Sequence, residues 1–180
     1  MRTEDRKTYD IVFTGVMAAI IFAVTYLRVP FFGSKLHFAN AMCLLAGLLF
    51  GPVTGGLAAG IGSALYDLAY YDAVQVCITF VSKFAMAWVC GKLAGTARRD
   101  FEPGHLRLAV SCVIGAFTYV GLYMLKTFVY QRYVYGFAPD AVQLTMMSKL
   151  PASLINAVTA LIAAPIFYRA VRPAIRRLGR

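Results

Sequence analysis

The sequence is short of charged residues, cysteine and histidine, and these shortages exclude several classes of protein. Only 14% of its 180 residues are charged, against roughly a quarter in an average soluble domain. Four cysteines without a CxxC pair, and two histidines, indicate neither a disulfide scaffold nor a zinc site. Since 60% of the residues are apolar and the mean hydropathy is +0.67, a soluble domain of this size has no interior large enough to bury them.

Motifs of enzymes are also missing. The chain has no HExxH, GxSxG or Walker sequence and no pair of carboxylates at helical spacing. Asp67 and Asp72 flank a predicted loop, where solvated carboxylates are common. We therefore expect a protein that is not an enzyme and that itself binds no cofactor or metal. All four cysteines fall in apolar stretches and are expected to be buried and unreactive: Cys43, Cys77, Cys90 and Cys112.

What the sequence does contain is a series of long apolar stretches. A membrane-spanning helix needs about 20 mostly apolar residues, and six stretches approach that length: 11–27, 38–50, 53–68, 74–94, 108–129 and 148–168. They predict an all-α membrane protein with six transmembrane helices in a single domain of residues 1–180. Gly51 and Pro52 leave almost no loop between the second and third stretches, which alternatively form one re-entrant hairpin.

The net charge of +10 fits membrane topology better than a nucleic-acid partner. Twelve of the 18 basic residues lie in the N-terminal tail, near the loop after the fourth stretch and at the C-terminus. Six spans put these segments on one side of the membrane, and the positive-inside rule makes that side cytoplasmic. Because the charges are divided among three short segments, we expect no nucleic-acid binding. The sequence predicts a multi-pass protein of the plasma membrane with both termini in the cytoplasm.

Small residues recur every fourth position in three of the stretches. Such spacing places them on one face of a helix and lets a neighbouring helix approach closely. In the second and third stretches the series of glycines is expected to pack inside the protein: Gly47, Gly51 and Gly55, then Gly56 and Gly60. The stripe in the first stretch faces either the inside or another protein: Gly15, Ala19 and Ala23.

Polar stripes occupy the predicted outer halves of the last three stretches. Each stripe has helical spacing and therefore lies on one face of its helix, whereas the inner halves are almost wholly apolar. Together the stripes predict a cup that is open outside and closed below, a shape that suits a ligand pocket better than a channel. The stripes are Gln75, Thr79 and Lys83; Tyr119, Tyr123, Lys126 and Tyr130; and Lys149, Ser153 and Asn156.

Asp67 and Lys83 stand out because ionisable groups inside a membrane usually have a partner or a function. They form either a structural ion pair or a unit in which Asp67 holds Lys83 toward a ligand. The outer loops, which include His37 and Tyr71, are candidate lids, although tyrosines also collect at membrane interfaces.

Several runs of residues resemble a known family. They are 36–41 (LHFANA), 48–56 (LLFGPVTGG), 60–68 (GIGSALYDL) and 79–83 (TFVSK). They are similar to the S components of energy-coupling factor (ECF) vitamin transporters, and closest to the riboflavin-type group. The resemblance implies a bacterial six-helix protein that captures a water-soluble vitamin outside the cell. It also implies partners, namely a transmembrane coupling subunit and two cytoplasmic ATPases that use ATP, with docking through Ala19 and Ala23. Asn40 stands where the family has an acid.

The leading hypothesis is a high-affinity capture subunit for a flat heteroaromatic micronutrient of the riboflavin, pyridoxine, thiamine-precursor or deazapurine class. The alternative is a stand-alone secondary carrier or channel for a small organic solute, and a third hypothesis is an intramembrane enzyme. Aromatic residues would line or stack on the ligand, and polar residues would satisfy its carbonyls and hydroxyls. The predicted substrate-binding residues are Lys83, Thr79, Gln75, Asn156, Tyr119, Tyr123, Lys149, Asp67, Tyr71, His37 and Asn40.

Overall fold

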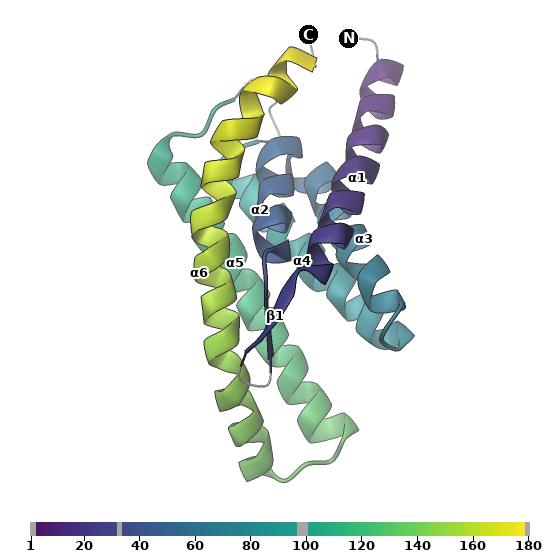
Figure 1. Cartoon of the computed structure of the whole chain (residues 1–180), viewed down its shortest axis with the longest axis vertical. Coiled ribbons are helices and arrows are strands. Elements are labelled where there is room, and N and C mark those ends of the chain that lie inside the picture. Colours follow the sequence, from purple (N-terminus) through teal and green to yellow (C-terminus); the bar gives the residue numbers. More distant parts are fainter. Residues whose placement is uncertain (1–2, 32–33, 97–100, 179–180) are drawn as a thin grey trace.

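The fold is a bundle of six helices with a small hairpin between the first two (Figure 1). The computed structural model describes the backbone of residues 3–31, 34–96 and 101–178, and the side chains of 7–27, 38–96 and 101–175. Within these ranges the prediction of six helices is confirmed. The elements are α1 (Thr3–Tyr26), β1 (Arg28–Phe31), β2 (Ser34–His37), α2 (Ala39–Phe50), α3 (Pro52–Leu68), α4 (Ala73–Ala94), α5 (His105–Val129), the π-helical turn η1 (Tyr130–Val134) and α6 (Pro139–Leu178).

The start of α1 and the end of α6 lie at the same end of the molecule, here named the terminal end (Figure 1). The connection between α5 and α6 lies at the opposite, distal end. Four helical segments in the described part of the chain are long and apolar enough to cross a membrane: Lys7–Tyr26, Ala73–Ala94, His105–Val134 and Pro139–Ile175. The chain is therefore a membrane protein by length and composition of its helices.

The two remaining helices are shorter. At 1.5 Å per residue, α2 is about 18 Å long and α3 about 26 Å, while the hydrocarbon core of a bilayer is about 30 Å thick. They are separate helices joined by a one-residue turn. Gly51 makes this turn with φ 85° and ψ −179°, and Pro52 begins α3. A positive φ favours glycine, and proline is tolerated in the first turn of a helix, where its missing N–H has no intrahelical partner.

The first predicted outer loop, which contains His37, includes two antiparallel strands, β1 and β2. Their register pairs Arg28 with His37 and Phe31 with Ser34, and β2 lies against α6. Pairing satisfies backbone groups that an irregular loop would leave open in apolar surroundings. Four strand residues at about 3.3 Å each add about 13 Å to the 18 Å of α2. The hairpin and α2 together have the length of one full span.

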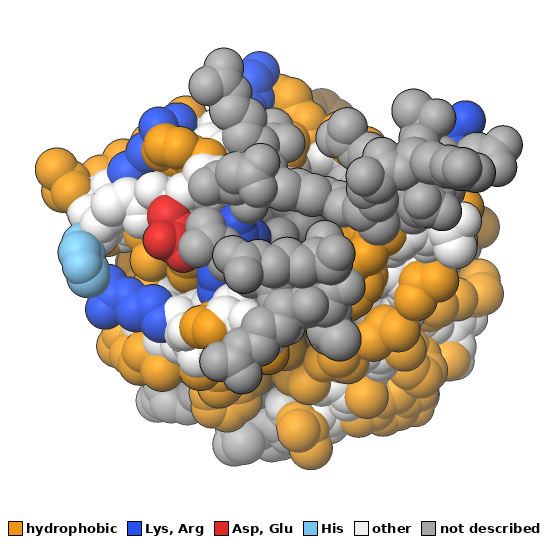
Figure 2. Space-filling view, turned by 90° about the horizontal axis from the view of Figure 1, so that it is seen from above, with side chains coloured by type: hydrophobic (Ala, Val, Ile, Leu, Met, Phe, Trp, Pro, Cys, Tyr) orange, Lys and Arg blue, Asp and Glu red, His pale blue; other side chains and the backbone are white. Residues whose placement is uncertain are grey.

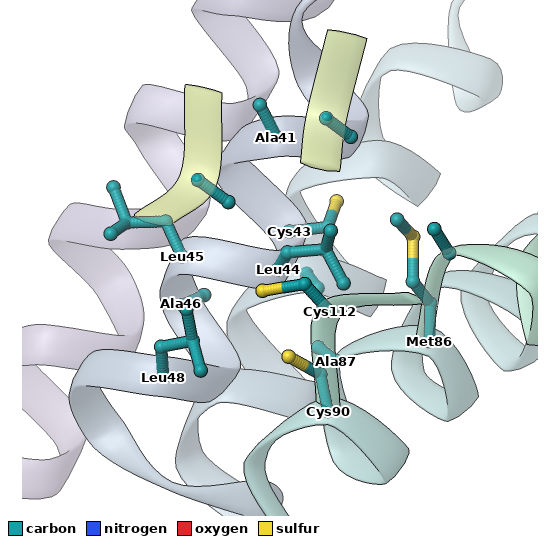
Figure 3. Packing of buried hydrophobic residues seen from close by; sticks show 14 of the residues in the cluster. Ala41, Cys43, Leu44, Leu45, Ala46, Leu48, Met86, Ala87, Cys90 and Cys112 are labelled. Carbon is teal, nitrogen blue, oxygen red and sulfur yellow. The ribbon is translucent and has the colours of Figure 1, made fainter. Parts of the chain in front are cut away.

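Close helix packing fills the terminal half of the molecule. A buried apolar cluster joins α2, α4 and α5 (Figure 3), with Leu44, Met86 and Cys112 each 0% exposed. A Cβ at Gly47 would overlap the backbone of Ala87, so the two helices touch backbone to backbone there. The internal packing predicted for the glycine series is confirmed. The further close approaches are Gly55 to Ala46, Gly56 to Phe84, Gly60 to Phe80, and Gly91 to Gly47 and Gly51.

The cysteines divide into two groups. Cys43, Cys90 and Cys112 are buried, as expected, but Cys77 is exposed. The prediction for Cys77 was wrong because hydropathy does not distinguish the two faces of an apolar helix. Cys77 lies two positions from both Gln75 and Thr79, and two positions turn a helix by about 200°. Its side chain therefore points away from the face that carries those polar residues.

The sixth helix is longer than its apolar stretch. It runs from Pro139 to Leu178 although Pro151, Pro165 and Pro173 lie inside it. Each proline removes one backbone hydrogen bond, and packing of α6 against α2 and α5 holds the helix through these points. Before α6, η1 closes with a bond from the Tyr135 N–H to the Tyr130 carbonyl, which adds one residue to the last turn of the α5 segment.

Basic side chains gather at the terminal end, which Figure 2 shows from above. The buried Arg172 donates to the Leu49 carbonyl near the end of α2 at 3.3 Å, and to the Phe101 carbonyl at 3.4 Å. Arg107 donates to the Leu93 carbonyl near the end of α4 at 2.7 Å. Helix C-termini expose carbonyls that lack intrahelical partners and carry partial negative charge. These arginines thus stabilise the C-terminal ends of α2 and α4. The cytoplasmic position of the terminal end of the molecule stays a prediction.

Candidate ligand-binding site

A cavity of about 510 Å³ lies in the distal half of the molecule, and all six helices contribute to its wall. Its residues come from the ends of α1, α3 and α5 and from the starts of α2, α4 and α6. Successive helices alternate in direction, so these segments meet at the distal end. The volume lies within the range of about 300–1,000 Å³ that is typical of small-molecule sites.

All ten residues of the three polar stripes line this cavity. They are Gln75, Thr79 and Lys83 from α4; Tyr119, Tyr123, Lys126 and Tyr130 from α5 and η1; and Lys149, Ser153 and Asn156 from α6. Asp67 and Tyr71, from the end of α3 and the turn that follows, also line it. Helical periodicity in the sequence therefore identified the faces of α4, α5 and α6 that surround one space. That these residues bind a ligand stays a prediction.

Lys83 lies at the deepest part of the α4 stripe and is only 4% exposed. Its ammonium donates to the Asn40 side-chain oxygen and lies 3.7 Å from the centroid of the Tyr119 ring. An ammonium has three N–H donors, and within the described residues the bond to Asn40 is the one hydrogen bond that Lys83 makes. Lys83 is therefore held in place while retaining donors for a group in the cavity.

Aromatic rings form one side of the cavity beside Lys83. The rings of Tyr119 and Tyr123 are 6.1 Å apart between centroids with an interplanar angle of 24°. They lie one helical turn apart on α5, so their faces are stacked along the helix axis. We name these two rings the aromatic wall. The negative face of the Tyr119 ring attracts the Lys83 ammonium that lies over it.

Asp67 is also buried, with 9% of its surface exposed. Its carboxylate accepts a hydrogen bond from the Thr79 hydroxyl at 2.5 Å. This bond joins the end of α3 to the α4 stripe one turn before Lys83. The sequence left two interpretations of Asp67 and Lys83, a structural ion pair or a unit in which Asp67 holds Lys83 toward a ligand. The structure shows a hydrogen bond from Thr79 to Asp67 and one from Lys83 to Asn40.

Two predicted binding residues differ from the rest. Asn40 is 1% exposed and is absent from the cavity wall, whereas its neighbour Ala39 lines it. One position turns a helix by about 100°, which carries Asn40 behind Lys83 and makes it a support for that side chain. The side chain of His37 lies outside the described residues, and its backbone pairs with Arg28 in the hairpin.

Other wall residues were not predicted as binding residues. Ser63 and Tyr66 precede Asp67 at spacings of four and one, and the spacing of four was a usable signal in the sequence. Gln131 gave no such signal because η1 shifts the helical register after Tyr130. Three stripe residues in the wall, Lys126, Tyr130 and Ser153, were also absent from the predicted binding residues. The remaining members of this group are Thr25, Ala39, Asp72, Ile78, Ser82, Thr127 and Tyr135.

The stripe on α1 lies on the outer surface. Ala19 and Ala23 are exposed, and a Cβ at Gly15 would meet no atom of the described residues within 4 Å. The opposite face of α1 is buried against α3, where a Cβ at Gly62 would overlap the Ala18 carbonyl. The sequence allowed this stripe to face either the inside of the protein or another protein. In the structure it does not pack inside, so it is available to a partner.

These features define a class: a six-helix membrane protein with a cavity of small-molecule size at one end and a closed core at the other. A family model described as "ECF-type riboflavin transporter, S component" matches residues 5–173. A solved structure of the S component of a bacterial ECF transporter has the same fold. It superposes with a TM-score of 0.67 at 16% identity and covers 94% of this chain and 98% of that chain.

A curated relative matches a shorter part of the chain. It is an uncharacterized protein of Pyrococcus woesei, 40% identical over 57 residues, which are 31% of this chain. The chain spans 38% of that relative's length. The family match, in contrast, covers nearly the whole sequence. The chain belongs to the family of ECF-type riboflavin transporter S components, the substrate-binding subunits of ECF transporters. The resemblance seen in the sequence is confirmed.

Proposed function

We propose that this protein captures a flat heteroaromatic vitamin or related micronutrient at the outer face of a bacterial plasma membrane. The observation that carries the proposal is the distal cavity, whose wall combines ten polar and aromatic stripe residues from α4, α5, η1 and α6. The ligand classes that suit it are those of riboflavin, pyridoxine, the pyrimidine precursor of thiamine, and deazapurines. The family assignment favours this function over a stand-alone carrier or an intramembrane enzyme.

The chemistry of the wall suits such a ligand. The stacked rings of Tyr119 and Tyr123 offer a flat surface, and ring contacts contribute about 0.5–1.5 kcal/mol each beyond burial. Lys83 would donate to a carbonyl or ring nitrogen at the edge of the bound ring. Analogues that lack this acceptor would leave the buried ammonium with an unmet donor, a loss that makes such sites selective.

The closed terminal half supports a function that needs a partner. Below Lys83, α4 buries Met86, Ala87 and Cys90 in an apolar core against α2 and α5. Release on the inner side would therefore require movement of the whole subunit. We propose that a transmembrane coupling subunit, working with two cytoplasmic ATPases, docks on the exposed α1 stripe and supplies that movement. The ATP is bound by those partners.

Ligand identity and the role of Lys83 are tested together. The purified protein is denatured and the released small molecules are identified by mass spectrometry; a yellow preparation would indicate a flavin. We expect Lys83→Met to weaken binding of that ligand by about 10- to 100-fold, since a hydrogen bond from a charged group contributes about 1.5–3 kcal/mol. Lys92→Met is the matched control, because Lys92 lies on the same helix over the Trp88 ring and outside the cavity. Equal affinity of Lys83→Met and wild type would reject this site.

Docking is tested by the double substitution Ala19→Leu and Ala23→Leu. We expect ATP-dependent uptake to be lost while ligand affinity stays at the wild-type value, because bulky side chains would keep a partner helix away. Ala109→Leu, on an exposed part of α5, is the control. Unchanged uptake by the double variant would rule out docking at the stripe. Uptake by cells without the ATPases would favour the stand-alone carrier.

A further inference from the structure

Two lysines on the distal side of the cavity extend the chemistry of the site beyond ring binding. Lys126 projects from α5 and Lys149 from α6, and both line the cavity. Each is partly buried. Lys126 lies seven positions beyond Tyr119 on the same helix, which is about 10 Å along its axis. Lys126 therefore lies at the distal edge of the aromatic wall, beside Tyr123.

The charged groups around the cavity are three lysines and two aspartates. The lining includes Lys83, Lys126, Lys149, Asp67 and Asp72, and no other residue of formal charge among those described. Both carboxylates already accept hydrogen bonds inside the protein. Asp67 accepts from Thr79, and Asp72 caps α4 by accepting the backbone N–H of Gln75 at 2.9 Å. The wall thus has a formal charge of +1, and its acids contribute to holding the fold.

Neither distal lysine has a hydrogen bond or an ion pair with another residue of the described ranges. Lys126 has two ring faces nearby, with its Nζ 5.6 Å from the centroid of Tyr123 and 6.0 Å from that of Tyr130. It lies within electrostatic range of Lys149 as well as of Asp67 and Asp72. Two ammonium groups that line one partly buried space repel each other, and an anion between them would reverse that energy.

Hydrogen-bond chemistry points the same way. The distal part of the wall presents two ammonium groups and the phenols of Tyr130 and Tyr135, together with acceptor oxygens on Asp72 and Gln131. An ammonium donates but never accepts, and Asp72 is already engaged as the cap of α4. Charge-assisted hydrogen bonds to a carboxylate or a phosphate are roughly twice as strong as neutral ones. A group with several negatively charged acceptor oxygens therefore satisfies the two ammonium groups better than a neutral hydroxylated chain does.

We propose that Lys126 and Lys149 form an anion subsite, so that the captured ligand carries a carboxylate or phosphate group in addition to its flat ring. The inference rests on the proposed function and narrows its substrate class. The ring lies against Tyr119 and Tyr123, and the anionic group lies just beyond Tyr123, about 10 Å along the helix axis from the level of Tyr119. Specificity then has two parts. Lys83 recognises the edge of the ring, and Lys126 and Lys149 recognise the negative charge.

The test compares matched probes that differ in charge. Riboflavin is paired with riboflavin 5′-phosphate, and pyridoxine with pyridoxine 5′-phosphate and with 4-pyridoxic acid, so that phosphate and carboxylate are tested separately. Dissociation constants are measured for purified wild type, for Lys126→Met with Lys149→Met, and for Lys92→Met. We expect at least one anionic probe to bind wild type tenfold or more tightly than its neutral partner, with affinity that falls as salt is raised.

In the double variant we expect this preference to shrink by at least tenfold, whereas Lys92→Met keeps it. The released ligand from wild type is also identified by mass spectrometry, and an anionic molecule supports the proposal. A neutral or cationic released ligand, the lack of any anionic preference in every pair of probes that binds, or a preference that survives in the double variant would overturn the anion subsite. Neutral binding that still depends on Lys83 would leave the proposed function intact. A protein that releases no ligand and binds no probe would contradict both.

Discussion

The distal and terminal halves of this molecule are made of the same six helices but are packed in opposite ways. In the terminal half, glycines let α2, α3 and α4 touch through their backbones. In the distal half, tyrosines and lysines project inward and keep a space of about 510 Å³ open. Residue size along one helix explains the difference. On α4, the cavity residues Gln75, Thr79 and Lys83 are followed by the packed Ala87 and Gly91.

The distal half also shows how a membrane protein stabilises buried ionisable side chains. An ionisable side chain costs about 2.5–3.5 kcal/mol in the centre of a membrane helix on insertion scales. Here contacts with Asn40 and the Tyr119 ring offset the cost of burying the Lys83 ammonium. A hydrogen bond from Thr79 offsets the cost of burying the Asp67 carboxylate. The close-packed half supplies a rigid base for these pairs. Substitutions in the terminal half should therefore change stability alone, and those in the distal half should change ligand binding as well.

The largest effect is expected from Gly47→Leu in the terminal half. A Cβ at this position already overlaps the Ala87 backbone, and a flexible side chain cannot move aside to make room because the obstacle is main chain. We expect a loss of about 3 kcal/mol or more, seen as loss of monodisperse protein after extraction or as a much lower thermal midpoint. Gly121→Leu on α5 is the control, since a Cβ there meets nothing within 4 Å. Equal behaviour of the two variants would contradict the close-packing account.

Asn40→Leu should lower both stability and ligand affinity. It removes the acceptor that holds Lys83 and leaves a buried ammonium with one partner fewer. We expect a loss of about 1.5–3 kcal/mol in stability and roughly tenfold weaker ligand binding, measured by thermal denaturation and by titration. Gln143→Leu, on the exposed face of α6, controls for the loss of an amide. Full ligand affinity in Asn40→Leu would show that Lys83 needs no such support.

Arg172→Met should separate stability from binding. The guanidinium joins α6 to the Leu49 and Phe101 carbonyls at the terminal end. Because these bonds are long, at 3.3 and 3.4 Å, we expect a loss near the lower end of the usual range, about 1–2 kcal/mol. Ligand affinity should stay within about twofold of wild type, and Arg169→Met on the exposed surface is the control. A large fall in affinity would show that the two halves are coupled.

The smallest effect is expected from Thr79→Val, which keeps the side-chain shape and removes the hydroxyl that donates to Asp67. We expect about 1 kcal/mol of destabilisation and a several-fold fall in ligand affinity, by thermal midpoint and titration respectively. Thr118→Val is the matched control, because Thr118 donates to the Ile114 carbonyl of its own helix. If the two variants bind ligand equally well, the Thr79–Asp67 bond does not contribute to the site.

Helical periodicity explains why much of the site was predictable. Residues three or four positions apart lie on one face of a helix whatever surrounds it. The sequence alone therefore grouped Gln75, Thr79 and Lys83, and likewise the stripes on α5 and α6. Apolar length predicted six helices for the same reason, since both properties are local to each segment. The family resemblance also depended on local runs, such as residues 60–68, which contain Asp67.

The tertiary structure decided which faces meet, because periodicity orients a face without naming its neighbour. It placed Asn40 behind Lys83, directed Cys77 outward, and turned the Ala19 and Ala23 stripe to the surface. It also paired β1 with β2 in the first predicted outer loop, which adds to the length of α2. Contacts between segments distant in the sequence set these outcomes. Which residues share one face of a helix, in contrast, was already set by their spacing in the sequence.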